Sequence, residues 1–328
     1  MLKVAMLSGW HVHAKDYANQ VSKIENAAIS AVWDEDPERG RAWADELGVP
    51  FEEDLQQVLN RDDVDAVIVD APTNMHTEVM IAAANAGKHI FTEKVMALTV
   101  AECEAIAEAV RKAGVKFCIS YPHRTFPANL FAKKAVEENW LGEVTLLRVR
   151  NAHNGAVGNW LPPHFYDPEA CGGGAMIDLG AHPMYLSRWL LGKPKNISSV
   201  FTRHTGRAVE DNAVSVIEFE NKAIAIVETG FVTPVSPFSL ELYGTEGSLF
   251  VGGMDNTVRI SSKKYAPEAE GYVIPDQLPP ALPSAMEQWV NGILKDEKIH
   301  FGLEEGIQLT QLMEGAYQSH RSGCRVEL

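Results

Sequence analysis

Short apolar runs alternate with amphipathic helical patterns along the first third of the chain. The apolar runs are Val4–Leu7, Ala27–Trp33, Ala66–Val69, His89–Thr92 and Lys116–Ser120. Gly48, Gly87 and Gly114 end the helical patterns between them, because glycine readily adopts the backbone conformation found just beyond a helix. Short uninterrupted apolar runs are typical of strands buried on both faces. Five such strands alternating with helices predict right-handed crossovers and a doubly wound parallel α/β sheet.

The pattern changes after Pro122. A helical pattern at Pro127–Trp140 leads into Glu143–Ala152, which alternates as a half-buried strand does. Strand-like segments separated by turns then fill residues 197–260, and two helical segments follow at Ser284–Leu294 and Leu303–His320. This order predicts an α+β region with a mainly antiparallel open sheet. The 328 residues are therefore expected to form two domains, 1–122 and 123–328.

Composition and charge narrow the class of protein. Acidic residues outnumber basic ones by 44 to 29, for a net charge of −15, which disfavours nucleic acid and anionic membrane surfaces as partners. No run of about 18 apolar residues is available for a membrane span, and the apolar N-terminal run is too short for a signal peptide. The four cysteines are scattered and form no C-x-x-C pair. Reduced cysteines are typical of the cytoplasm, which is the expected location.

The turn after the first strand can be compared with the phosphate-binding turn of dinucleotide-binding folds. In those folds the main chain approaches a pyrophosphate at a helix N-terminus, and glycines leave room for it. Here the turn reads Ser8-Gly9-Trp10-His11-Val12-His13-Ala14, a partial match to the glycine pattern. Asp34 ends the second strand roughly 25 residues beyond Gly9, where a carboxylate can bind a ribose diol. Taken alone, the first turn could be an ordinary strand-to-helix turn, and Asp34 could be an ordinary helix cap. The turn and Asp34 together favour nucleotide binding.

Histidines raise the question of a metal. The candidates are His11, His13, His123, His153, His164 and His182. The spacing of Asp178 and His182 could hold a metal, but no three ligands lie at a recognised local spacing. Scattered histidines are commonly structural, so the expectation is no metal.

Six segments resemble the glucose–fructose oxidoreductase, inositol dehydrogenase and rhizopine-catabolism family, Gfo/Idh/MocA. Gly172 to His182 reads GGGAMIDLGAH and matches the family's G-G-G-x-x-x-D-x-G-x-H, and Gly87 to Lys94 reads GKHIFTEK and is similar to its G-K-H-V-x-x-E-K-P. Four shorter segments also look like those of the family: Ala71–His76, Tyr121–Arg124 with Pro127, Asp211–Ala213 and Tyr243–Ser248. The chain departs from the family in its eroded glycine turn, in Val95 instead of proline, and in Tyr185 instead of a frequent aspartate.

The resemblance implies an N-terminal Rossmann domain that binds NAD(P), and an oxidoreductase acting on a sugar, polyol or related carbonyl. Lys94, Asp178 and His182 match the family's catalytic positions. The first turn and the resemblance together give the expected cofactor-binding residues: Ser8, Gly9, Trp10, His11, Val12, Asp34, Pro72, Thr73, Asn74, His76, Glu93 and Lys94. The expected substrate-binding residues are Lys94, Arg124, Trp160, Asp178 and His182.

Elementary chemistry supports these roles. Hydride transfer from a carbinol carbon requires a group that takes the hydroxyl proton. Lys94 directly follows the fourth predicted strand, at the sheet edge where such folds bind ligands. Asp178 and His182 are four residues apart in a helical pattern, which places both on one face and would let the carboxylate orient the imidazole. A solvated lysine and a helix-surface pair are the alternative interpretations.

NAD is the expected cofactor, with NADP disfavoured because its 2′-phosphate would meet the negative charge of Asp34. Relatives commonly pair through the exposed face of their antiparallel sheet, so a homo-oligomer, a dimer or a tetramer, is expected. Two other functions stay open. One is a non-catalytic protein that senses a nucleotide or sugar, which the eroded turn favours. The other is a lyase or glycosidase that uses tightly bound NAD, as some relatives do.

Overall fold

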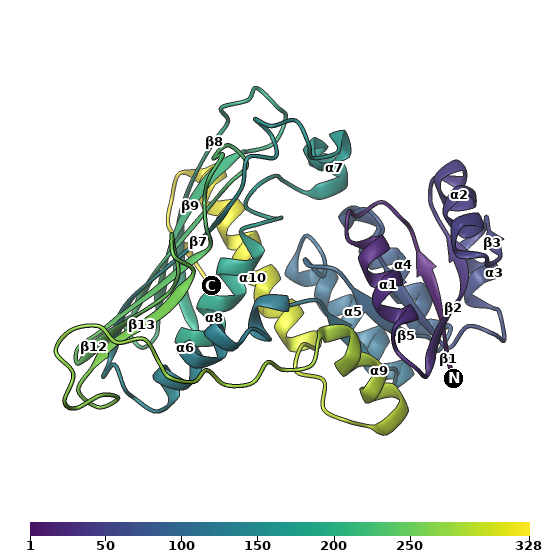
Figure 1. Cartoon of the computed structure of the whole chain (residues 1–328). Coiled ribbons are helices and arrows are strands. Elements are labelled where there is room, and N and C mark those ends of the chain that lie inside the picture. Colours follow the sequence, from purple (N-terminus) through teal and green to yellow (C-terminus); the bar gives the residue numbers. More distant parts are fainter. The chain divides into compact units, whose positions relative to one another are not determined.

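The chain divides into two compact units. The computed structural model describes residues 1–328, coloured along the sequence in Figure 1. Unit 1 contains residues 1–121 and 283–310, and unit 2 contains residues 122–282 and 311–328. The chain thus leaves unit 1 after Tyr121, close to the predicted boundary, and returns to it at Pro283. The sequence pattern did not indicate this return.

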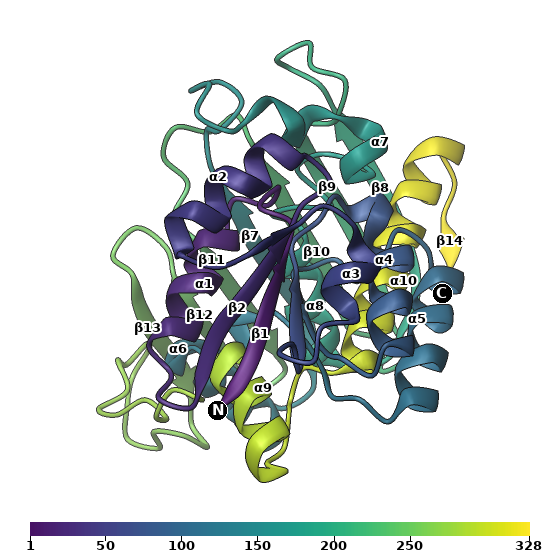
Figure 2. The same ribbon diagram turned by 90° about the vertical axis from the view of Figure 1, so that its right-hand side faces the viewer.

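Unit 1 is built on a six-stranded parallel sheet with the strand order β3-β2-β1-β4-β5-β6. The strands are β1 (Leu2–Leu7), β2 (Ala27–Trp33), β3 (Phe51–Glu52), β4 (Ala66–Val69), β5 (His89–Thr92) and β6 (Phe117–Ile119). The chain moves outward from β1 in one direction and then from β4 in the other, which confirms the predicted doubly wound arrangement. Figure 2 shows β1 beside β2. The sequence pattern missed only β3, because a two-residue strand is too short to show a periodicity.

Sequence signals mark the ends of several helices of unit 1, although α3 (Leu55–Leu59) was not predicted. They are α1 (Ala14–Ser22), α2 (Pro37–Leu47), α3 (Leu55–Leu59), α4 (His76–Asn85), α5 (Val100–Ala113), α9 (Ala285–Lys295) and the first part of α10 (Leu303–Ser322). Asp36 caps α2 by accepting the N–H groups of Glu38 and Arg39. Thr99 caps α5 in a reciprocal pair with Glu102. These side chains satisfy helix N–H groups that have no partner within the helix.

The returning segment completes the core of unit 1. Trp289 of α9 is fully buried, and its ring lies 5.6 Å from that of Phe91 on β5. Phe301 packs 6.2 Å from the ring of Tyr121, and its carbonyl accepts the N–H of Ile119 on β6 at 2.9 Å. Residues distant in sequence from the sheet therefore close its β6 edge and fill the space beside it.

Unit 2 contains an eight-stranded sheet with the order β13-β12-β11-β7-β10-β9-β8-β14. Its strands are β7 (Val144–Ala152), β8 (Pro194–Thr202), β9 (Asn212–Phe219), β10 (Ile224–Gly230), β11 (Ser239–Gly244), β12 (Gly247–Gly252), β13 (Thr257–Ser262) and β14 (Val326–Glu327). Only β7 and β10 pair in parallel, so the predicted mainly antiparallel sheet is confirmed. Helix α6 (Pro127–Glu137), the short α7 (Pro168–Cys171), α8 (Ala181–Leu191) and the end of α10 accompany the sheet. None of the helices combines the length and the apolar character that crossing a bilayer requires.

Candidate active site

The first turn of unit 1 leaves the N-terminus of α1 open. Ser8 follows β1 with a φ of 77°, and its hydroxyl accepts the N–H of Trp10 at 3.1 Å. His13 stands at the N-cap of α1 without a hydrogen bond from its side chain to the helix. The first N–H groups of α1 therefore have no side-chain acceptor, which is the arrangement that binds a phosphate at a helix N-terminus.

Asp34 is more deeply engaged than the sequence indicated. Its side chain is 0% exposed, and its oxygens accept the N–H groups of Gly9 and Asp36, each at 2.8 Å. The guanidinium of Arg39 bridges Asp34 and Glu35, with an Nη2–Oδ1 and an Nη2–Oε1 distance of 2.5 Å. Asp34 thus holds the first turn against the end of β2. Its role at a ribose diol stays a prediction.

Glu35, which follows Asp34 in the sequence, has one carboxylate oxygen that accepts no hydrogen bond. This oxygen, Oε2, is buried. Burial raises the pKa of Glu35, with the charge of Asp34 adding to the effect. A buried acceptor without a donor is costly unless a ligand supplies one. The sequence showed Glu35 only as the residue after Asp34, and gave no signal that it would be the open acceptor.

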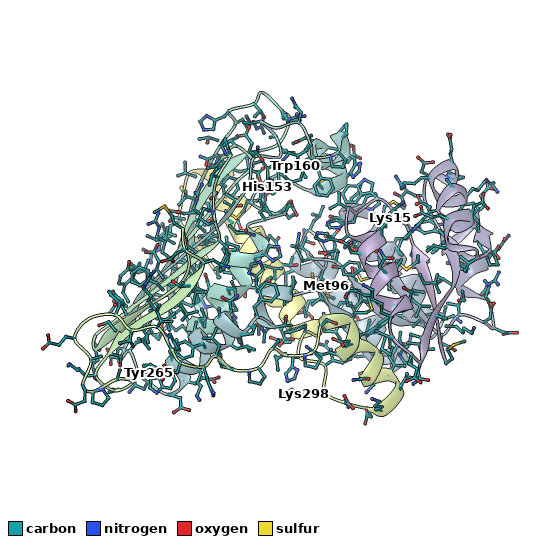
Figure 3. The ribbon with its side chains drawn as sticks, in the orientation of Figure 1. Lys15, Met96, His153, Trp160, Tyr265 and Lys298 are labelled. Carbon is teal, nitrogen blue, oxygen red and sulfur yellow. The ribbon has the colours of Figure 1, made fainter.

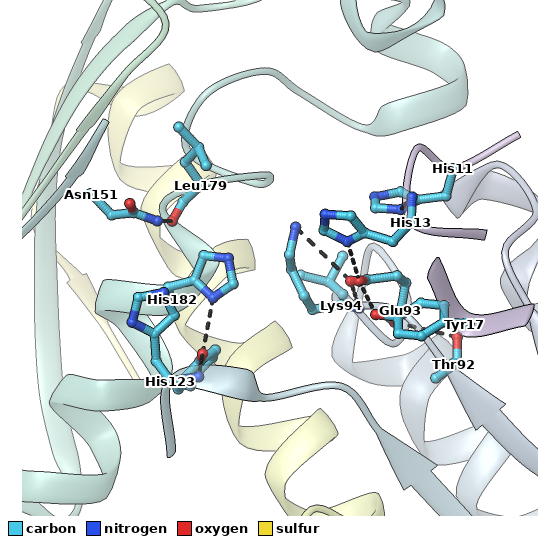
Figure 4. A network of polar contacts seen from close by, with 12 residues as sticks. His11, His13, Tyr17, Thr92, Glu93, Lys94, His123, Asn151, Leu179 and His182 are labelled. Atoms are coloured by element: carbon cyan, nitrogen blue, oxygen red, sulfur yellow. Dashed lines mark hydrogen bonds and ion pairs between the residues drawn. The ribbon is translucent and has the colours of Figure 1, made fainter. Parts of the chain in front are cut away.

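Lys94 lies at the carboxyl end of β5, where the sequence predicted it. Its side chain is only 2% exposed, and its Nζ lies 4.0 Å from Oε2 of Glu93 (Figure 4). The main-chain N–H of Lys94 also donates to Oε2 of Glu93, at 2.7 Å. The peptide bond to Val95 is cis. A buried ammonium beside a carboxylate has the composition of a proton-transfer site rather than of a solvated surface lysine.

Glu93 is the centre of a buried polar cluster. Its Oε1 lies 2.7 Å from Nδ1 of His13 and accepts the phenol O–H of Tyr17. Burial alone would raise the pKa of Glu93, but the charges of Lys94, His11 and His13 hold it well below its usual range. Burial and the charge of Glu93 raise the pKa of Tyr17 well above its usual range. Glu93 is therefore a carboxylate and Tyr17 a neutral donor in this cluster.

Asp70 is a buried acid that sequence reasoning missed. It directly follows β4 and is fully buried, and neither oxygen of its carboxyl group has a hydrogen-bond partner. Burial and the charge of Glu93 raise its pKa well above the usual range. The only signal in the sequence was its place at the end of an apolar run, immediately before Ala71-Pro72.

The segment after β4 anchors itself through His76. Pro72 precedes a short 3₁₀ turn at Thr73–Met75, and His76 begins α4. Nδ1 of His76 lies 3.0 Å from the carbonyl of Val95, and Nε2 lies 3.0 Å from that of Ala71. Burial lowers the pKa of His76. A neutral imidazole donates from one nitrogen only, so His76 is bonded either to the backbone that follows Lys94 or to Ala71, depending on which nitrogen carries the proton.

In unit 2 the glycine cluster is packed against Glu210 and Tyr317. A Cβ on Gly173 would lie 1.9 Å from the hydroxyl of Tyr317, and one on Gly174 would lie 2.1 Å from the carbonyl of Glu210. Oε1 of Glu210 accepts the N–H groups of Gly174 at 2.9 Å and Met176 at 3.0 Å, and the O–H of Tyr317. The absence of side chains at these glycines therefore makes room for the protein's own Tyr317 side chain and Glu210 main chain.

His182 is oriented differently from the prediction. Helix α8 begins at Ala181, so Asp178 lies in the turn that precedes the helix and not within it. Nδ1 of His182 lies 2.9 Å from the hydroxyl of Tyr185, which also accepts the N–H of His123 at 3.2 Å (Figure 4). The orienting group at Nδ1 is therefore Tyr185, where the family often has aspartate.

The other predicted substrate residues lie in unit 2. The guanidinium carbon of Arg124 lies 5.2 Å from the centre of the Trp189 ring. Trp160 is 54% exposed; its Nε1 donates to Asn154 at 3.0 Å, and its ring lies 4.6 Å from that of His153 (Figure 3). An exposed indole fixed by a hydrogen bond presents a flat apolar face, which is the kind of surface that stacks on a sugar ring.

These features define a class of protein. A doubly wound parallel sheet, an open helix N-terminus after β1 and a buried lysine after β5 are the parts of a nucleotide-binding oxidoreductase. Residues 4–121 match the family model described as "Oxidoreductase family, NAD-binding Rossmann fold", and residues 130–250 match the "GFO/IDH/MocA C-terminal domain". The chain belongs to the Gfo/Idh/MocA family, and the predicted NAD-binding oxidoreductase is confirmed at this level.

Relatives and solved structures agree with this assignment. The chain is 32% identical to scyllo-inositol 2-dehydrogenase (NAD(+)) of Bacillus subtilis (strain 168) over 254 residues, which are 74% of this chain and 70% of that protein. In fold it is similar to the aldose-aldose oxidoreductase of Caulobacter crescentus, with a TM-score of 0.84 and 23% identity, covering 100% of this chain and 99% of the other. A levoglucosan dehydrogenase in complex with NADH gives a TM-score of 0.85 at 22% identity, covering 99% and 98%.

Proposed function

We propose that this enzyme transfers a hydride between NAD and a hydroxyl-bearing carbon of a sugar, a polyol or a sugar-like carbonyl compound. The observation that carries the proposal is the buried Lys94 beside Glu93 at the carboxyl end of β5. Relatives named as inositol 2-dehydrogenases and as a D-glucoside 3-dehydrogenase support the substrate class.

The residues of unit 1 fit the cofactor. The open N-terminus of α1 suits the pyrophosphate, and the unpartnered Oε2 of Glu35 suits a ribose hydroxyl. Gly9 packs closely against Trp43, since a Cβ there would lie 3.1 Å from the indole ring. Bound NAD supplies the carbon that accepts or returns the hydride. At the end of β2 two carboxylates, those of Asp34 and Glu35, are paired with one guanidinium, that of Arg39. The 2′-phosphate of NADP would add negative charge there, so NADP is disfavoured.

Lys94 is proposed as the acid–base group. A substrate hydroxyl that loses a hydride from its carbon must also lose its proton, and an amine in a buried site can take it. Glu93 sets the position of Lys94 through two contacts, one to its main chain and one to its ammonium. In unit 2, His182 is proposed to bind the reacting hydroxyl, with Tyr185 fixing its ring. Asp178, Arg124 and Trp160 are proposed as substrate-binding residues.

A panel of polyols and sugars with NAD, followed at the nicotinamide absorbance, tests the proposal. On a substrate that turns over, Lys94→Ala should lower kcat by about 10² to 10⁴ while the affinity for NADH stays close to wild type. Lys112→Ala is the matched control, because Lys112 is an exposed lysine of the same unit near the C-terminal end of α5. Near-normal turnover of Lys94→Ala would refute the proposed role. Exchange of a substrate C–H with solvent, without net NADH, would instead favour the lyase or glycosidase.

The proposal extends to assembly and location. Val200, Val214, Val216 and Ile224 are exposed apolar residues on neighbouring strands β8, β9 and β10. Apolar side chains on one sheet face favour burial against a second copy, so a dimer or tetramer is proposed, and light scattering after gel filtration measures it. The four cysteines are free, which supports a cytoplasmic location.

A further inference from the structure

Two histidines of the first turn meet Glu93 at the end of β5. One donor atom each from His11, His13 and Glu93 lies within 4.8 Å of the other two. His11 and Glu93 are buried, and His13 is partly exposed. The imidazole rings of His11 and His13 are 4.9 Å apart, and Figure 4 shows them above the Glu93 carboxylate. All three residues belong to unit 1, so the cluster is complete within one compact unit.

The surroundings hold Glu93 in the manner of a metal ligand. Tyr17 donates its O–H to Oε1, and the main-chain N–H of Lys94 donates to Oε2. Such outer hydrogen bonds orient the carboxylates and imidazoles of metal centres. Tyr17 is itself buried, so the hydroxyl is fixed in the position from which it holds Glu93.

The contacts of Glu93 also suit a cation. Glu93 is nearly fully buried, and the ammonium of Lys94 lies 4.0 Å from its Oε2. Its other oxygen, Oε1, lies 2.7 Å from Nδ1 of His13. A divalent ion held between Oε1 and the imidazoles would bring positive charge to a buried carboxylate.

We propose that His11, His13 and Glu93 bind one divalent transition-metal ion of the zinc type. Two imidazoles and one carboxylate form a three-ligand set that leaves a coordination position for water or a substrate atom. Imidazole ligands favour Zn²⁺, Co²⁺ or Ni²⁺ over Mg²⁺ and Ca²⁺, which prefer oxygen. Where Nδ1 of a histidine gives its lone pair to the ion, the ion replaces the contact which that nitrogen makes now: the main-chain N–H of His13 at 3.2 Å for His11, or Oε1 of Glu93 at 2.7 Å for His13. A neutral ring that gives a lone pair to the ion carries its proton on the other nitrogen, whichever nitrogen binds.

The test is a metal titration of the full-length chain. Protein freed of metal with a chelator is titrated with Co²⁺ and followed by visible absorption; Zn²⁺ is then added to displace the Co²⁺, and calorimetry gives the stoichiometry. No nucleotide is present, because the same turn is proposed to hold the cofactor. One ion per chain and a Co²⁺ spectrum of low coordination number are expected. Mg²⁺ should leave that spectrum unchanged.

Four variants locate the ion. His13→Ala and Glu93→Gln should each weaken Zn²⁺ binding by more than a hundredfold, since loss of a direct ligand costs more than the 10- to 100-fold typical of an outer contact. Tyr17→Phe, which keeps all three ligands, should weaken it by about tenfold. His204→Ala is the control, because His204 is an exposed histidine of unit 2. Circular dichroism checks folding, and His13 is exposed enough for its replacement to be tolerated.

The outcomes are decisive. Zn²⁺ binding that survives both His13→Ala and Glu93→Gln in folded protein overturns the proposal, as does a loss of equal size in His204→Ala. Binding of NADH by the metal-free protein is measured separately. It bears on the proposed dehydrogenase function alone, so either idea can fail without the other.

Discussion

Replacing Tyr185 with phenylalanine tests how His182 is held. The variant keeps the ring and removes only the hydroxyl, which lies 2.9 Å from Nδ1 of His182 and accepts the N–H of His123. A phenol that accepts from the His123 N–H can still donate its own proton to Nδ1 of His182. With the bond in that direction, a neutral imidazole carries its proton on Nε2, from which it can donate to a substrate oxygen.

The magnitude follows from the two lost contacts. A buried polar group left without its partner costs about 1–3 kcal/mol. If roughly 1.4–2.7 kcal/mol of this appears in the transition state, Tyr185→Phe lowers kcat by about 10- to 100-fold. A misaligned imidazole affects the reacting hydroxyl more than the remote parts of the substrate, so KM should change by less than kcat.

The assay is steady-state NADH production on the substrate found in the panel. Tyr243→Phe is the control, since its hydroxyl donates to Glu241 on the same strand at 2.8 Å, and its kcat should stay within twofold of wild type, about 0.4 kcal/mol. A kcat for Tyr185→Phe equal to that of the control would refute the positioning role. A rise in KM with unchanged kcat would show that Tyr185 supports binding and not the chemical step.

Three further variants address the cofactor, the glycine cluster and pH. Arg39→Gln leaves the carboxylates near the first turn without their cation. NADPH should then bind about fivefold more weakly in a fluorescence titration, because removing one charge about 4 Å away in water costs roughly 1 kcal/mol. Tighter NADPH binding would contradict this reasoning. Gly174→Ala forces a Cβ to within 2.1 Å of a carbonyl and should lower Tm by several degrees, at about 2–4 °C per kcal/mol, whereas Gly302→Ala, with its nearest neighbour at 3.8 Å, should not. Burial lowers the pKa of His76 in the folded protein. As the pH falls below about 6.5, this histidine therefore takes up a proton in the unfolded chain before it does so in the folded one, and the fold loses stability. His76→Gln should reduce the difference between Tm at pH 7.5 and Tm at pH 5.5, and an unchanged difference would exclude His76 as its source.

The sequence predicted those parts of the molecule that depend on local pattern. Strands β1, β2, β4, β5 and β6 were visible as apolar runs, and the family motifs identified Lys94 and His182. Contacts between segments that are far apart in the sequence could not be predicted from it. Glu210 accepts the N–H of Gly174, 36 residues earlier in the chain, and no local pattern predicts this hydrogen bond. Glu93 and His13, separated by 80 residues, carry no local spacing that would indicate a common site. The engagement of Asp34 by Arg39 depended on how α2 begins after its Asp36 cap.

The discontinuity of unit 1 has a consequence for synthesis of the protein. The strands of its sheet leave the ribosome first, yet Trp289 and Phe301, which pack against Phe91 and Tyr121, are translated only after the whole segment up to Leu282. Until then the β6 edge and the apolar surface beside Phe91 have no cover on the nascent chain. Exposed apolar surface of this kind is what chaperones bind. The core of the nucleotide-binding unit can therefore be completed only after residues 122–282 of unit 2 have been translated. A chain truncated at residue 282 lacks the segment that completes this core.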